Sequence, residues 1–108
     1  MTAAKNPLNA PASESIENGK LSISKLDAAG ATFRLSSNDP KVHIGSFWIK
    51  QANEQKIEEQ STKKSEVYFT ISKAVIETWL GLKLFAQCNA IQNGDVITSP
   101  KTLFTVVA

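Results

Sequence analysis

The sequence predicts an all-β fold, an antiparallel sandwich of about seven strands with one short helical crossover near residues 73–80. Short runs of alternating apolar and polar residues recur along the chain and are separated by turn residues, as in antiparallel β domains. An Asn-Gly pair at residues 93–94 lies between two such runs and favours a hairpin. Apolar residues over 75–80 instead repeat at helical spacing, which predicts the crossover.

The length of 108 residues allows one two-layer core and is too short for two independent ones. Residues 1–18 are rich in Ala, Asn, Pro, Ser and Glu, and Pro7 and Pro11 resist regular structure. We therefore expect a flexible leader over 1–18 and a single β-sandwich domain over 19–108. The first residues lack the apolar stretch of a secretory signal, which leaves a cytoplasmic protein, signal-independent export or an excised module as alternatives.

Three runs in the first half alternate in hydrophobicity and are predicted strands, namely residues 20–24, 31–35 and 42–49. In the second run, Phe33 and Leu35 should point inward. The third run is the most hydrophobic, and Trp48 is its expected core anchor. Residues 50–65 have almost no apolar content and carry charges of both signs, which indicates a solvated edge strand or loop, or a short exposed helix.

Residues 66–71 form a predicted strand that runs directly into the helical segment. Ser72 is placed to cap this helix, and Gly81 can close it in a left-handed conformation. Between them, four apolar side chains repeat at helical spacing: Val75, Ile76, Trp79 and Leu80. This pattern predicts a crossover of two turns that lies over one open end of the sandwich.

The last third of the chain is a predicted hairpin followed by a final strand. Residues 82–91 and 96–98 are joined through Asn93-Gly94, which supplies the positive φ angles of a type I′ turn. Ser99-Pro100 then interrupts the pairing, and residues 102–107 resume as a strand. A proline at this place suggests a bulge or a switch between sheets on an edge.

This order of elements resembles the immunoglobulin-like repeats of large bacterial surface or secreted proteins. The likeness is firmest over about residues 66–107 and rests on the stretches 69–76, Gly81, 93–94, 98–100 and 103–106. The resemblance implies an immunoglobulin-like β-sandwich and a spacer or adhesive role in tandem arrays. The chain departs from such repeats at Ser72, where proline is expected, and in the high charge of residues 50–65, and it shows no internal repeat.

Charge and composition weigh against several classes of function. Lys plus Arg is 12 and Asp plus Glu is 10, so the net charge of +2 attracts phosphate backbones only weakly. Arg34 is the single arginine, and arginine supplies most bidentate contacts to bases and phosphates, so nucleic-acid binding is disfavoured. Cys88 is the single cysteine, which excludes an intramolecular disulfide. No apolar run approaches the roughly 18 residues that span a bilayer, so we predict no membrane insertion.

We predict a non-enzymatic protein without catalytic, cofactor-binding or metal-binding residues. His43 is the single histidine, and with Asp39 as its nearest carboxylate it lacks partners for a metal site. Cys88 with His43 as base could form a nucleophilic pair, but the alternation of residues 82–90 favours a core position for this thiol. Glu58-Glu59 would point to opposite faces of a strand, which indicates a solvated charge run.

Four residues are candidates for a ligand or partner surface: Trp79, Tyr68, Asn93 and Asp95. Trp79 could be a stacking platform, or it could seal one end of the core. The leading hypothesis is a recognition, adhesion or structural module that presents loops and an edge strand to another protein or a neighbouring domain. The alternatives are a carbohydrate-binding β module, and a self-associating subunit that uses β-augmentation through residues 96–98 or 102–107.

Overall fold

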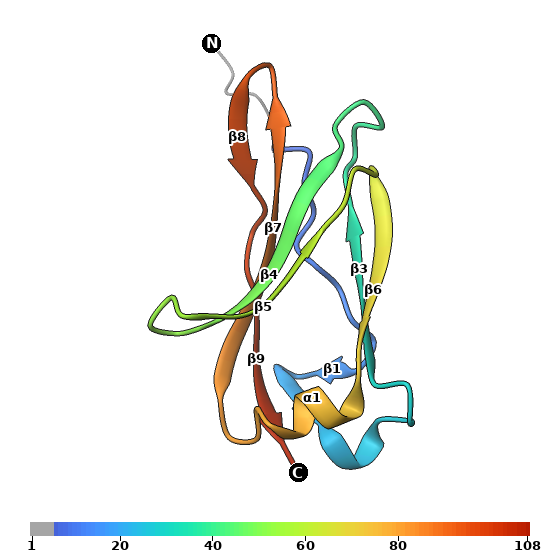
Figure 1. Cartoon of the computed structure of the whole chain (residues 1–108), viewed down its shortest axis with the longest axis vertical. Coiled ribbons are helices and arrows are strands. Elements are labelled where there is room, and N and C mark those ends of the chain that lie inside the picture. The colour runs from blue at the N-terminus through green and yellow to red at the C-terminus, as the bar shows by residue number, and fades with distance from the viewer. Residues whose placement is uncertain (1–5) are drawn as a thin grey trace.

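The computed structural model describes residues 6–108, whose strands form two sheets that face each other (Figure 1). The nine strands, in chain order, are β1 (Ile16–Glu17), β2 (Lys20–Ser22), β3 (Ala31–Ser36), β4 (Ile44–Gln51), β5 (Lys56–Ser61), β6 (Glu66–Ile71), β7 (Lys83–Gln92), β8 (Asp95–Thr98) and β9 (Thr102–Val107). A 3-10 turn covers Ile23–Lys25, and the helix α1 covers Lys73–Glu77. The larger sheet has the order β1-β2-β9-β7-β4-β5, with β8 also paired to β7, and the smaller sheet contains β3 and β6.

The two facing sheets make an all-β sandwich, so the predicted fold class is confirmed, and the strand pairing can be compared with that of the immunoglobulin fold. The second and fifth strands of that fold pair in one sheet, as β3 and β6 do, and its third, sixth and seventh strands form the other sheet, as β4, β7 and β9 do. All pairs are antiparallel except β2 with β9, which run parallel. The strand that would follow β6 in the smaller sheet, the fourth of the immunoglobulin fold, is not among residues 6–108.

The core lies between the two sheets and is built on phenylalanine. Phe33 of the smaller sheet is fully buried, and its ring centroid lies 5.5 Å from that of Phe47 and 5.9 Å from that of Phe104, both of the larger sheet. Leu35 is also fully buried, so the predicted inward direction of Phe33 and Leu35 is confirmed. These contacts join the two layers directly.

The segment before β1 is part of the sandwich, which differs from the expected flexible leader over 1–18. Leu8 and Pro11 are buried, and Ala12 exchanges backbone hydrogen bonds with Arg34 of β3, at 3.0 and 2.7 Å. The prolines of this segment do not prevent such pairing, because an edge segment needs only some of its N–H groups. The leader expectation therefore does not hold for residues 7–17, and residues 1–5 lie outside the described part of the chain.

Trp48 is buried, but not in the central core where it was expected. Adjacent strand residues point to opposite faces, and in β4 it is Phe47 that enters the core cluster. Trp48 lies on the outer face of the larger sheet, between Gln87 of β7 and Glu59 of β5. Alternation alone could not decide which of two consecutive aromatic residues faces inward.

The crossover forms where it was predicted and closes the lower end of the sandwich in Figure 1. The Ser72 side chain accepts a hydrogen bond from the Val75 backbone N–H at 3.3 Å, which confirms the predicted cap. The helix is shorter than expected and ends at Glu77. Ile76 and Trp79 are buried, whereas Val75 and Leu80 are exposed, so only half of the apolar stripe contributes to the core.

The C-terminal hairpin also follows the prediction. Asn93 and Gly94 have φ angles of 52° and 82°, as a type I′ turn requires, and β8 ends immediately before Ser99. The Ser99 hydroxyl accepts a hydrogen bond from the Cys88 backbone N–H at 3.0 Å, which bridges the interruption in pairing. β9 is not an edge strand, because β2 and β7 flank it, so the 102–107 edge suggested by the sequence is corrected.

Candidate functional site

The structure does not bring together the four residues that the sequence offered as a surface. Trp79 is only 5% exposed and seals one end of the core. Tyr68 is 58% exposed on the outer face of the smaller sheet. Asn93 and Asp95 are exposed beside the tip of the β7–β8 hairpin, at the end of the molecule opposite α1 (Figure 1). These residues therefore form no common site.

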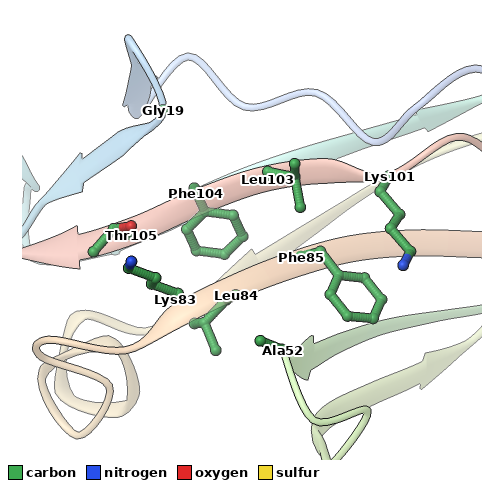
Figure 2. Close-up of a pocket in the computed structure, with 9 residues that line it drawn as sticks. All are labelled: Gly19, Ala52, Lys83, Leu84, Phe85, Lys101, Leu103, Phe104 and Thr105. Atoms are coloured by element: carbon green, nitrogen blue, oxygen red, sulfur yellow. The ribbon is translucent and has the colours of Figure 1, made fainter.

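A different surface stands out on the outer face of the larger sheet. A shallow groove of about 440 Å³ lies over β7 and β9, with the β4–β5 turn at its margin (Figure 2). Nine residues line it: Gly19, Ala52, Lys83, Leu84, Phe85, Lys101, Leu103, Phe104 and Thr105. We call this surface the β7–β9 groove.

The apolar part of the β7–β9 groove is the pair Phe85 and Leu103, which are opposite each other on neighbouring strands. Leu103 is 68% exposed, while Phe85 is almost fully buried although it points away from the core. The Lys101 amino group lies over the Phe85 ring, 4.3 Å from the centroid, and helps to cover it, as Figure 2 shows. This cation–π contact leaves the positive charge at the surface.

Two lysines flank this apolar pair along the strands. Lys83 lies opposite Thr105, one row beyond Phe85 on its own face, and Lys101 precedes Leu103 by two residues. Neither lysine forms an ion pair within residues 6–108, whereas Lys50 of β4 and Lys56 of β5 pair with glutamates. The groove therefore presents an apolar centre between two positive charges that have no acidic partner in this part of the chain.

Further apolar side chains continue along the same face. Ile91 lies on the same face of β7 as Phe85 and is 68% exposed. The residue opposite it, Val96 of β8, is 66% exposed. Trp48 lies between these two regions, with the Lys50 amino group 5.2 Å from its ring centroid. Its buried indole N–H has no acceptor among the described residues. The outer face of the larger sheet thus carries most of the exposed apolar side chains that lie on strands.

The outer face of the smaller sheet is polar. The Arg34 guanidinium donates to the Glu66 carboxylate at 2.6 Å, and this hydrogen bond and the charge of Glu66 raise the pKa of Arg34 further. The hydroxyls of Thr32 and Thr70 are 2.8 Å apart. These groups satisfy one another, and Tyr68 is the one aromatic residue among those lining the shallow hollow beside them.

The residues weighed as catalytic or metal-binding candidates lie in different surroundings, some exposed and one fully buried. His43 is exposed before the start of β4, and Cys88 is fully buried on the inward face of β7, as the alternation predicted.

Glu58 and Glu59 lie opposite Ile49 and Trp48, on opposite faces of β5, and Glu59 pairs with Lys56 at 2.8 Å. The predicted solvated edge strand is confirmed over residues 56–61. Within residues 6–108 no three His, Cys, Asp or Glu side chains cluster in a way that could hold a metal ion.

Burial raises the pKa of the Cys88 thiol, although the Ser99 hydroxyl opposes this effect. In the unfolded chain the thiol loses its proton above about pH 8.5, while in the folded protein it stays protonated to higher pH. The free energy of unfolding should therefore fall as pH rises from about 8 to about 10. Urea unfolding at both pH values should show a larger fall for the wild type than for Cys88→Ala. Equal falls in the two proteins would contradict this expectation.

Comparison of the chain with protein-family models, with curated proteins and with solved structures found no match. The structure contains, over residues 6–108, no helix with the length and apolar character needed to cross a membrane. The β7–β9 groove is thus distinguished by its geometry and chemistry alone.

The β7–β9 groove was not predicted from the sequence, although a signal was present. Leu84, Phe85 and Ala86 are consecutive apolar residues, and so are Leu103 and Phe104. In a strand with one solvated face, such a run places an apolar residue on the outside. Two runs of this kind in strands that pair with each other indicate an apolar patch on the outer face of a sheet.

Proposed function

We propose that this domain is a non-enzymatic module that binds another protein through the β7–β9 groove. The observation that carries the proposal is the position of two lysines, without acidic partners within residues 6–108, on either side of the Phe85–Leu103 pair. Exposed apolar side chains rimmed by charge are typical of protein-binding surfaces. A recognition role agrees with a rigid scaffold that holds these side chains on regular strands.

The charges define the chemistry of the partner. The backbones of Lys83 and Lys101 lie one row to each side of the apolar pair, about 13 Å apart along the strands at roughly 3.3 Å per strand residue, and the Lys101 amino group reaches back over the Phe85 ring. A partner that presents an apolar side chain flanked by two carboxylates would pair with both lysines and cover Leu103. Pairing of opposite charges would set the specificity and the rate of association more than the affinity.

A carbohydrate-binding role has less support. Saccharide recognition would need exposed aromatic faces, and Trp79 is buried. Tyr68 alone remains exposed, beside an Arg34–Glu66 pair whose groups already satisfy each other. The protein-binding role therefore fits the exposed side chains better.

A displayed library of short random peptides tests the proposal and does not require the partner to be known. Selection on the full chain should enrich peptides that carry an apolar residue flanked by Asp or Glu. Their affinity should fall at least tenfold on the double variant Lys83→Glu/Lys101→Glu, measured by fluorescence anisotropy, because each lysine site then repels the carboxylate it attracted.

The matched control is Lys63→Glu/Lys64→Glu, which makes the same change in net charge at exposed residues outside the groove. It should leave the affinity within about twofold. Selection that enriches no acidic peptides, or an equal loss of affinity in both double variants, would rule out the groove as the binding surface.

A further inference from the structure

The strand β6 has one side without a hydrogen-bonding neighbour among residues 6–108. It pairs with β3 alone, over all six of its residues and without a register shift. Because no strand of this part of the chain follows it in the smaller sheet, its other side is a regular edge. An unprotected edge is a template for pairing with another strand.

The hydrogen bonds of β3 identify which groups of β6 face this edge. Backbone groups of Arg34 bond to Ala12 on the far side of β3, so Arg34 and its opposite residue, Tyr68, form a non-hydrogen-bonded pair. The backbone N–H and C=O of Tyr68 therefore point away from β3. By the same alternation, those of Glu66 and Thr70 also face the edge, and no hydrogen bond to any of these groups occurs within residues 6–108.

The other edges of the structure carry features that discourage strand addition, and β6 does not. β5 contains Lys56, Glu58 and Glu59 and faces a bulge in β4, and β8 has only four residues and begins with Asp95. Charges, bulges and shortness are the usual protections of edge strands. β6 contains one charged residue, Glu66, and no proline.

The inward side chains of β6 are incompletely covered. Val67 and Phe69 pack against the core but remain only partly buried, although the Phe69 ring stacks on Phe47 at 5.8 Å between centroids. A strand added to this edge would place its own inward side chains beside them. Added pairing would therefore bury apolar surface as well as satisfy the edge.

We propose that β6 pairs antiparallel with β6 of a second copy of this chain, about a two-fold axis at Tyr68. In this register Tyr68 lies opposite its own copy, and Glu66 lies opposite Thr70 of the other chain. These are the residues whose backbone groups face the edge, so each can form the hydrogen-bonded pairs of an antiparallel ladder.

The side chains of β6 fit this register on both faces. Glu66, the one charge on the strand, meets a threonine rather than a second carboxylate, and it keeps its ion pair with Arg34. Val67 lies opposite Phe69 of the other chain, so the two incompletely covered side chains cover each other. Self-complementarity of this kind is what a two-fold interface requires, and it favours a second copy over an unrelated strand.

Sedimentation equilibrium of the full chain tests the proposal. The wild type should associate to twice the monomer mass, with a dissociation constant in the micromolar range. Tyr68→Pro removes the N–H at the centre of the ladder, where the folded monomer does not use it, and should weaken association at least tenfold. Tyr68→Ala keeps that N–H and should still form the dimer. Thermal melts of both variants check that the fold is retained.

Cysteine cross-linking tests the register. Opposite residues of an antiparallel pair are close enough for a disulfide, so Tyr68→Cys should form a covalent dimer on mild oxidation. Thr70→Cys should not, because the two copies of residue 70 would lie about 13 Å apart along the strands. The native Cys88 is buried and should not interfere. A wild type that stays monomeric at millimolar concentration, or equal cross-linking of both variants, would overturn the proposal.

Discussion

Gly30→Ala should destabilise the domain by about 3–5 kcal/mol, among the largest effects of any single substitution in this chain. Gly30 has φ of +104°, and a Cβ atom there would lie 1.9 Å from the Ile71 carbonyl oxygen and 2.8 Å from the Lys73 backbone nitrogen. Both are backbone atoms at the junction of β6 and α1, so the clash cannot be relieved by a side-chain rotation. Urea unfolding of the purified variant measures the loss.

Gly94→Ala is the matched control for this substitution. Gly94 also has a positive φ, +82°, but a Cβ atom there would meet nothing within 4 Å. This variant should lose only about 1–2 kcal/mol, from the unfavourable left-handed conformation. Equal losses of stability in the two variants would contradict the idea that the close approach to the β6–α1 junction requires glycine at position 30.

Phe33→Ala should cost about 3–5 kcal/mol, because it leaves a cavity between the two sheets. The Phe33 ring packs near Phe47 and Phe104 of the opposite layer, so its loss removes contacts that join the two sheets. Total stabilities of domains are about 5–15 kcal/mol, so this change removes a large share of what holds the fold together. The measurement is the midpoint of thermal or urea unfolding.

Leu103→Ala is the control for Phe33→Ala, because it removes an apolar side chain that is exposed rather than buried. Leu103 is 68% exposed, so removing its side chain should change the free energy of unfolding by no more than about 0.5 kcal/mol. A loss comparable to that of Phe33→Ala would contradict the assignment of Leu103 to an exposed face.

The features that could be predicted from the sequence are those set by neighbouring residues. The Asn93-Gly94 turn follows from the φ angles that these residues adopt easily, and the Ser72 cap from a hydroxyl placed before a helical repeat. The break at Pro100 follows from the missing N–H of proline. Each of these signals acts within a few residues, so each can be recognised in the sequence without knowledge of the tertiary structure.

The features that could not be predicted depend on residues far apart in the chain. The segment 7–12 pairs with β3 across more than twenty positions, and nothing in its Ala- and Pro-rich composition indicates a partner. The inward choice of Phe47 over Trp48 is set by the register of β4 between β5 and β7. The apolar runs of the β7–β9 groove are visible in the sequence, but they form one surface only when the last strand pairs with β7.

The parallel pairing of β2 with β9 also has a mechanical consequence. A pulling force applied along β9 would load its hydrogen bonds to β2 and to β7 in shear. Bonds loaded in shear must break together, whereas a strand pulled from its end across the ladder opens one bond at a time. A force applied along β9 is thus opposed by its hydrogen bonds to β2 and to β7 at the same time.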